Sequence, residues 1–212
     1  MKLEHWQGLL RTYRQVRALL DSALPPEPAA GEARTQVRVG QQGLAQLHHE
    51  LQGEVNGLRN ALGTAYREEE IDEALRPFVY LVDEQVLRRL ADMEQADWPL
   101  LQYKRFGTDA GGDLFYDLAD EKLTQRGASP LVFEMLHFCL TAGFEGRYVE
   151  NTARLRDYKE KLAARIPKPE AVPAPPPAVP QAPLMHAFPV RYYVASGFVA
   201  VTVPVLLWWL SR

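Results

Sequence analysis

The chain of 212 residues contains few of the residues that redox chemistry, export or nucleic-acid binding would require. A single cysteine, Cys139, cannot form an internal disulfide or by itself build a multi-cysteine zinc or iron–sulfur site. Lys and Arg number 24 against 27 Asp and Glu, so a net charge of -3 gives no electrostatic reason to expect nucleic-acid binding. The first 24 residues alternate charged and apolar positions and lack the uncharged core of a signal peptide. We therefore expect the N-terminal part of the chain in the reducing cytosol.

No catalytic or cofactor-binding pattern is complete in the sequence. Glu134 and His137 have the spacing of one half of a di-iron site, but the second Glu-x-x-His pair that such a site needs is absent. His137 and Cys139 are two residues apart and would point in different directions from a helix, so we expect Cys139 to be a buried apolar residue. The sequence predicts no catalytic residue, no metal and no cofactor. A helical enzyme with a di-metal site is the less favoured alternative.

The last part of the sequence is a candidate membrane anchor. Residues 192–211 contain no charge, and 20 helical residues would span about 30 Å, the thickness of a bilayer core. Aromatic residues suited to the membrane interface stand at both ends, Tyr192 and Tyr193 at one and Trp208 and Trp209 at the other, and Pro204 is tolerated in a spanning helix. The sequence therefore predicts a single transmembrane helix.

Residues 167–189 precede this anchor and are rich in proline. Proline occupies nine of the 23 positions, which favours an extended polyproline spacer of at most about 70 Å over an SH3-type ligand. We expect three parts: a helical domain at 1–166, a tether at 167–189 and an anchor at 190–212. Moving the few residues after the anchor across a bilayer costs far less than moving the polar domain, so we expect a cytoplasmic domain and a periplasmic C-terminus.

The first 90 residues show the apolar spacing of three long helices. The first is expected at about 3–20. The second carries one continuous apolar stripe, in steps of three and four residues, formed by Leu44, Leu47, Leu51, Val55, Leu58, Leu62 and Tyr66. The third begins near Glu68, and Pro77 is expected to kink it or to delay its start.

Shorter helices are expected in residues 100–166. A segment at 100–106 leads into a loop at 107–113, and Asp113 is expected to cap a helix that continues to Arg126. Ser129 and Pro130 suit the start of the next helix, and Gly143–Gly146 interrupts before a last helix to about Ile166. No strand pattern competes, so the predicted class is all-α with six or seven helices. Residues 1–166 carry 21 basic and 26 acidic side chains, a net charge of -5.

Three short motifs follow one another along this helical region. The first is Tyr80-Leu81-Val82-Asp83-Glu84, the second is Gly111-Gly112-Asp113-Leu114-Phe115-Tyr116 and the third is Gly143-Phe144-Glu145-Gly146-Arg147-Tyr148. Trp98 and Phe106 lie between the first two, and a Phe-Glu pair precedes Cys139. In this order, over about residues 30–160, the motifs resemble the TssL family, also called DotU or IcmH-like, of type VI secretion systems.

The resemblance implies a fold, a location and partners. It implies a hook-shaped cytoplasmic domain of two three-helix bundles, anchored in the bacterial inner membrane by one C-terminal helix. It also implies a non-enzymatic subunit that joins TssM-like (IcmF) and TssJ-like proteins and recruits the baseplate through a TssK-like protein. The proline tether and Pro77 depart from the family pattern. The alternatives are a DotU/IcmH-type subunit of a type IVB secretion system and an unrelated tail-anchored adaptor. We expect the isolated helical domain to be a monomer or a weak homodimer.

The first motif is the candidate partner-binding site. Asp83 and Glu84 end an apolar run, so we expect both carboxylates to reach solvent or a groove between the bundles and to bind a cationic surface of the baseplate partner.

The other two motifs are expected to be structural. We expect Gly143 or Gly146 to have a positive φ, while Phe144 and Tyr148 fill the core. Glu145 and Arg147 are expected to pair with each other and hold the turn. Gly111, Gly112 and Phe115 belong to the same set of motif residues.

Overall fold

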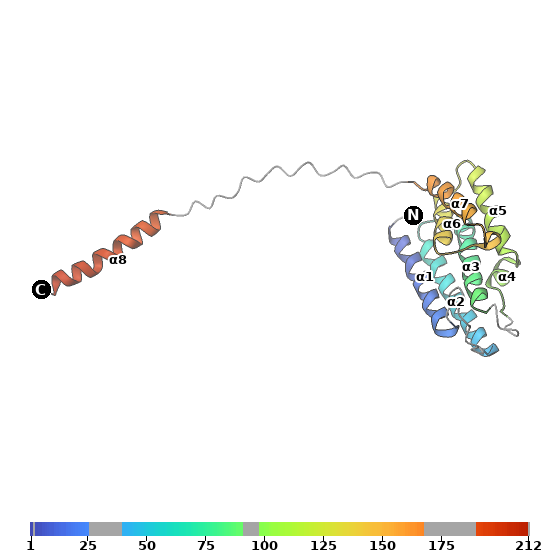
Figure 1. The fold of residues 1–212 in the computed structure, drawn as a ribbon, viewed down its shortest axis with the longest axis horizontal. Coiled ribbons are helices and arrows are strands. Elements are labelled where there is room, and N and C mark those ends of the chain that lie inside the picture. Colours follow the sequence, from blue (N-terminus) through green and yellow to red (C-terminus); the bar gives the residue numbers. More distant parts are fainter. Residues whose placement is uncertain (2, 26–39, 91–97, 168–189, 212) are drawn as a thin grey trace. The chain divides into compact units, whose positions relative to one another are not determined.

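The computed structural model describes residues 1, 3–25, 40–90, 98–167 and 190–211. These residues form α-helices and one short 3₁₀ helix, and they contain no strand. The chain divides into two compact units, Met1–Lys168 and Pro169–Arg212. The expected proline tether lies, apart from Pro167, outside the described residues. The all-α class that the sequence predicts is confirmed for the part of the chain that the structure describes (Figure 1).

The first unit begins with two long helices that are neighbours. Helix α1 spans Leu3–Ala23 and helix α2 spans Gln41–Leu62, and the two helices pack against each other. The apolar stripe predicted for α2 is buried from Leu44 to Leu62, whereas Tyr66 lies beyond the helix and is half-buried. A stripe that repeats every three or four residues gives a helix one apolar face, and burial of that face stabilises the pair.

Helix α3 spans Glu68–Leu90 and is the centre of the unit. Every residue from Pro77 to Asp83 is buried, so α3 has neighbours on all sides. Figure 1 shows α3 between α2 and α5. Pro77 does not delay the start of the helix, because α3 begins at Glu68 and continues through the proline. Packing around α3 therefore outweighs the hydrogen bond that Pro77 cannot donate.

The remaining helices of the unit are shorter. They are α4 (Leu101–Phe106), α5 (Gly111–Thr124), α6 (Pro130–Thr141), the 3₁₀ helix η1 (Gly146–Tyr148) and α7 (Thr152–Arg165). The prediction that Asp113 caps a helix was wrong: Ala110 is the N-cap, and Asp113 lies inside the first turn of α5. Both glycines before Asp113 therefore belong to α5 and not to a loop, because close packing determines where the helix begins.

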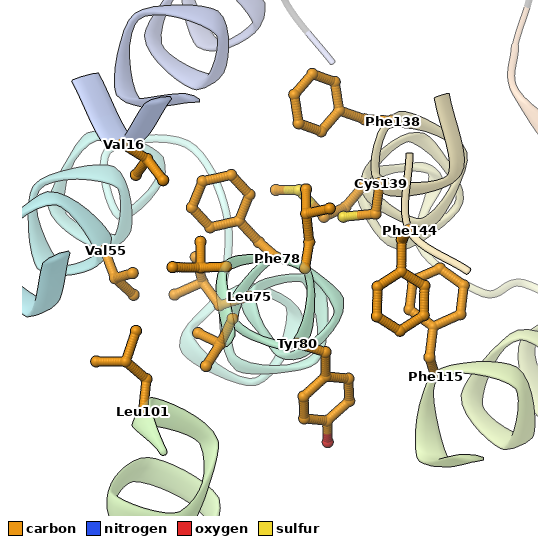
Figure 2. Close-up of a cluster of buried hydrophobic side chains, with 14 of the residues drawn as sticks. Val16, Val55, Leu75, Phe78, Tyr80, Leu101, Phe115, Phe138, Cys139 and Phe144 are labelled. Carbon is orange, nitrogen blue, oxygen red and sulfur yellow. The ribbon is translucent and has the colours of Figure 1, made fainter. Parts of the chain in front are cut away.

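One apolar core joins these helices around α3. Figure 2 shows Val16 of α1 and Val55 of α2 pointing toward α3 from one side, and Phe115 of α5 and Phe144 from the other. Cys139 is fully buried in this core, as the sequence predicts. The arrangement agrees with two three-helix bundles, α1–α3 and α5–α7, with α3 also packed against α6 of the second bundle.

Candidate functional site

Asp83 is a buried hydrogen-bond acceptor that joins α3 to the start of α4. Its Oδ1 accepts from Trp98 Nε1 at 2.8 Å and from the backbone N–H of Leu101 at 3.0 Å, and its Oδ2 accepts from the N–H of Gln102 at 2.8 Å. The residue is 1% exposed. Burial raises the pKa of Asp83 above its ordinary value, and the three donors oppose that rise. The expectation that this carboxylate reaches solvent or a groove is wrong, because α4 and Trp98 cover it.

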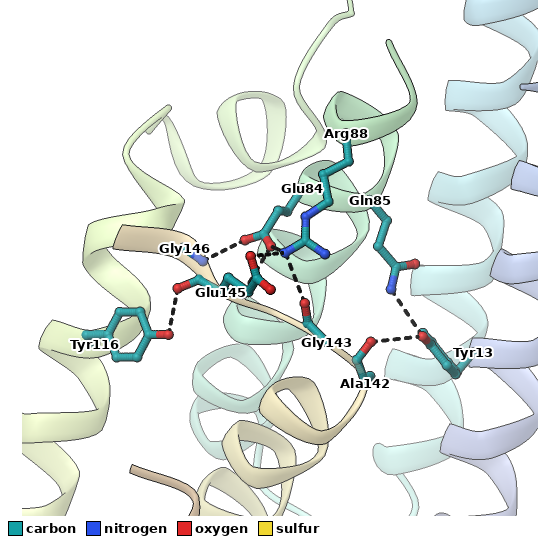
Figure 3. A network of polar contacts seen from close by, with 9 residues as sticks. All are labelled: Tyr13, Glu84, Gln85, Arg88, Tyr116, Ala142, Gly143, Glu145 and Gly146. Carbon is teal, nitrogen blue, oxygen red and sulfur yellow. Dashed lines mark hydrogen bonds and ion pairs between the residues drawn. The ribbon is translucent and has the colours of Figure 1, made fainter. Parts of the chain in front are cut away.

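Glu84 points to a different neighbour, the turn after α6. Its carboxylate accepts from the backbone N–H of Glu145 at 3.0 Å and of Gly146 at 2.9 Å, and it pairs with Arg88 one helical turn away (Figure 3). The side chain is 17% exposed. Burial raises the pKa of Glu84, and Arg88 opposes the rise. Glu84 is therefore engaged within the molecule, although a small part of it meets solvent.

Arg88 extends this contact along the same turn. Its guanidinium donates to the carbonyl of Gly143 at 3.0 Å and lies 3.2 Å from the carboxylate of Glu145. A second polar link runs nearby, in which Gln85 Nε2 donates to Tyr13 Oη at 3.1 Å and Tyr13 donates to the carbonyl of Ala142 at 3.3 Å (Figure 3). Side chains of α3 thus hold the turn after α6 through several hydrogen bonds.

Three of the four glycines of the second and third motifs are required by backbone conformation or close approach. A positive φ was predicted at Gly143 or Gly146, and both glycines have one, 99° and 50° respectively. A Cβ at Gly146 would lie 2.7 Å from the carbonyl oxygen of Gly112. A Cβ at Gly111 would lie 1.9 Å from Gln102 Oε1 and 2.7 Å from the Tyr80 ring, whereas one at Gly112 would meet nothing closer than 3.4 Å. The start of α5 is therefore packed directly against the turn and α3.

Aromatic rings fill the space between α5, the turn and α7. The ring centroids of Phe115 and Phe144 are 4.3 Å apart, and those of Tyr116 and Tyr148 are 4.5 Å apart. Tyr116 Oη donates to the carbonyl of Glu145 at 2.8 Å. Phe144 is buried and Tyr148 is half-buried, so both contribute to the core as the sequence predicts.

Glu145 and Arg147 do not pair with each other, contrary to the prediction. Glu145 pairs with Arg88 of α3, while Arg147 donates to Asp117 of α5 at 2.8 Å and lies 5.4 Å from the centres of the rings of Tyr116 and Tyr148. The short 3₁₀ turn that begins at Gly146 directs the two side chains toward different helices. Glu145 therefore links the turn to α3, and Arg147 links it to α5.

The residues considered for a metal site or a nucleophile, Glu134 and Cys139, lie in surroundings that do not suit either role. The carboxylate of Glu134 is buried and pairs with the N-terminal ammonium of Met1. Burial raises the pKa of the Cys139 thiol well above its ordinary value, so it is not a thiolate at neutral pH. Within the described ranges, no group of three His, Cys, Asp or Glu side chains could hold a metal ion.

The second unit contains one long apolar helix, α8 (Val190–Leu210). Its window Tyr193–Leu210 has a mean hydropathy of 1.8 and no buried residue, and it is long and apolar enough to cross a membrane. The hydroxyl groups of Ser196 and Thr202 donate to the carbonyls of Tyr193 and Phe198 in α8, and that of Ser211, just after the helix, donates to the carbonyl of Trp208. A lipid environment requires such internal pairing.

All the predicted anchor residues belong to α8. Pro204 lies inside the helix, and the side chains of Tyr193, Trp208 and Trp209 are exposed near its two ends. The side chain of Tyr192 lies outside the described residues. Exposed aromatic rings at both ends of an apolar helix are suited to the two interfaces of a bilayer.

These features define a class of protein that combines a helical domain with a candidate membrane-spanning helix. In the helical domain, the residues of the three motifs make internal contacts. The chain belongs to the DotU family of type VI secretion system proteins, whose family model matches residues 18–212. The match includes α8. A search of curated protein sequences finds no match.

Solved structures of the same family share the fold. DotU from Francisella novicida is 16% identical, with 78% of this chain and 100% of that chain covered and a TM-score of 0.59. The cytoplasmic domain of TssL from Acinetobacter baumannii is 15% identical, with 77% and 97% covered and a TM-score of 0.58. SciP/TssL from enteroaggregative Escherichia coli 042 is 25% identical, with 81% and 97% covered and a TM-score of 0.55.

Proposed function

We propose that the chain is a non-enzymatic scaffold subunit of a type VI secretion system. In this proposal it joins TssM-like and TssJ-like proteins in the membrane complex and recruits the cytoplasmic baseplate through a TssK-like protein. The observation that carries the proposal is the family match, which extends over the helical domain and α8 together. The family's description names the type VI system, which favours it over the type IVB alternative. Stoichiometric iron or manganese in the purified chain would contradict a scaffold role.

The proposed location is the bacterial inner membrane, with the helical domain in the cytoplasm and the residues after α8 in the periplasm. The uniform apolar surface of α8 supports the span, and the charged surface of the domain makes its transfer across a bilayer costly. A Ser211→Cys variant tests the orientation, because Cys139 is buried and will not compete for a thiol reagent. We expect labelling of intact cells by an impermeant reagent. Labelling only after lysis would refute this orientation.

We propose that the recruiting surface lies on the turn after α6, at residues 143–149, and not on the carboxylates of Asp83 and Glu84. Both carboxylates already accept hydrogen bonds within the molecule. The turn is held by α3 and α5, and Val149 at its end exposes 61% of its surface. A rigid element with an exposed apolar residue suits an interface anchor. In this proposal Asp83 and Glu84 are positioning residues for that surface.

A binding assay with the purified baseplate partner tests the surface. Val149→Asp is expected to weaken binding of the TssK-like protein by at least about tenfold, the loss that an interface anchor causes, while the TssM-like protein still binds. The matched control is Leu3→Asp, which changes another exposed apolar residue, on α1. Equal binding by the parent and Val149→Asp would place the recruiting surface elsewhere.

A further inference from the structure

Charge is distributed unevenly over the helical domain. Helix α1 carries three basic and two acidic residues and α7 carries five and two, a combined net charge of +4. Residues 1–166 as a whole carry -5, so the remainder of that region carries -9. Two helices are thus basic in a domain that is otherwise strongly acidic.

Most of the described cations that the fold leaves unused lie on α1 and α7. Among described residues of the domain, the Lys and Arg side chains without an ion pair, hydrogen bond or ring contact are Arg11, Arg14, Arg17, Lys104, Arg126, Arg154, Arg156 and Lys159. Six of these eight lie on α1 and α7. By contrast, the cations of α3 mostly have partners, such as Asp21 for Arg89. The unused cations therefore concentrate on two helices.

Helix α6 lies between these two helices. On one side, Trp6 and Tyr13 of α1 contact the ring of Phe138 of α6 with centroid separations of 5.9 and 5.3 Å. On the other side, α7 packs against α6, and Lys159 is close enough to His137 to add to the effect of burial in lowering the His137 pKa. The six unused cations of α1 and α7 thus lie on the two helices that contact α6. We call the exposed surface of these three helices the α1–α6–α7 face.

We propose that the α1–α6–α7 face binds anionic lipid headgroups at the membrane surface. The inference rests on the proposed membrane anchoring, because α7 ends only 24 residues before α8 begins. At about 3.1 Å per residue this segment reaches at most about 75 Å, so a bilayer surface is always within range of the domain and its local concentration is high. A basic face near such a surface is attracted to anionic lipid, while the acidic remainder of the domain is repelled.

Lipid fits this face better than an acidic protein does. The six cations are spread over two helices that both contact α6. Diffuse attraction to many headgroups needs only charge and proximity, and each Lys or Arg near an anionic surface adds to it. A specific protein partner would instead use a few well-packed anchor residues.

The test uses the full-length chain in nanodiscs that contain phosphatidylcholine alone or a mixture with phosphatidylglycerol. A fluorophore on Ala163→Cys of α7, an exposed site, reports contact with a lipid whose headgroup carries a nitroxide quencher. A second label on Gly57→Cys of α2, where a Cβ meets nothing within 4 Å, serves as the reference position. We expect quenching at Ala163 in the phosphatidylglycerol discs, loss of it at high salt, and little quenching at Gly57.

Paired neutral substitutions identify the residues responsible. Arg156→Gln with Lys159→Gln is expected to lower the equilibrium constant for the lipid-bound state about thirtyfold. Lys104→Gln with Arg126→Gln is the matched control, because among the described residues of the domain it removes the two unused cations outside α1 and α7. Equal quenching in both kinds of disc, or no effect of the first pair, would overturn the proposal and leave an acidic protein as the partner of this face.

Failure of the membrane anchor would give a separate signature. A chain that is not retained in the disc would contradict the proposed span by α8. The same labelled chain mixed with phosphatidylglycerol vesicles would then still decide the matter: flotation that requires Arg156 and Lys159 would support lipid binding, and no flotation would refute it.

Discussion

Replacing Asp83 should destabilise the helical domain more than replacing any exposed acid. The Asp83 carboxylate satisfies three buried donors, one from Trp98 and two from the first residues of α4. Asp83→Ala removes the acceptor for all three. A buried donor without a partner costs about 1–3 kcal/mol, and part of α4 can open to water. We expect the free energy of unfolding to fall by about 3–5 kcal/mol, a large part of the total for a domain of this size.

A graded series separates lost hydrogen bonds from lost charge. Asp83→Asn keeps one carbonyl oxygen for the donors that Oδ1 serves but turns an amide donor toward the N–H of Gln102. Its expected cost is about 1–3 kcal/mol, clearly less than that of Asp83→Ala. Asp109→Ala is the control, because Asp109 is exposed and surface substitutions usually change stability by less than about 0.5 kcal/mol.

Chemical denaturation of a chain ending at Pro167 measures these differences. Fluorescence of Trp98 in a Trp6→Phe background reports locally on the contact, since these are the two tryptophans of that chain. We expect the order parent, Asp83→Asn, Asp83→Ala in decreasing stability. An Asp83→Ala domain within about 1 kcal/mol of the parent would show that the three donors do not depend on Asp83.

Further predictions concern the glycines and one histidine, all measured by the same denaturation assay. Gly111→Ala should destabilise although alanine favours helices, because its Cβ would meet the Tyr80 ring; Gly112→Ala, its matched neighbour, should be neutral or stabilising. Gly146→Ala should cost more than Gly143→Ala, since it adds a clash with a carbonyl to the strain of positive φ, about 1–3 kcal/mol at each position for the strain alone. Burial lowers the pKa of His48, with Lys104 and His49 adding to the effect, so the folded state binds fewer protons than the unfolded state below about pH 6.5. Stability should therefore fall as pH drops from about 7.5 to 5.5, by at most about 1.4 kcal/mol per pH unit from this group, and His48→Gln should reduce the slope. An unchanged slope in His48→Gln would refute that assignment.

The helices were predictable where one face of a helix is buried. The stripe of α2 repeats every three or four residues because only that face meets α1 and α3. Ser129 and Pro130 likewise predicted the start of α6, because proline fits the first turn of a helix. Helix α5 was placed three residues too late, with Asp113 in place of Ala110 as its cap, because paired glycines usually indicate a loop. Here Gly111 reflects the closeness of Tyr80, a contact that sequence spacing does not show.

The site was predictable in its residues but not in its contacts. The three motifs do come together, since Glu84 bonds to the turn and Gly112 lies against Gly146. The direction of Asp83 depends on donors 15–19 residues further along the chain, and no local pattern reports them. The pairing of Glu84 with Arg88 could have been predicted, because residues four apart share a helix face.

The adjacency of Asp83 and Glu84 follows from the central position of α3. Consecutive residues of a helix point about 100° apart, so two neighbouring carboxylates on one helix can reach two different elements. Asp83 meets the donors of α4, and Glu84 meets the backbone and Arg88 at the turn after α6. Each charge therefore has its own donors, and the two like charges do not need a shared cationic partner. It follows that loss of baseplate binding in a charge-reversed Asp83 or Glu84 variant would report a displaced α4 or turn. The isosteric Glu84→Gln keeps one acceptor oxygen for the turn and turns an amide donor toward the other N–H, so it removes one hydrogen bond together with the charge and should displace the turn less than charge reversal does.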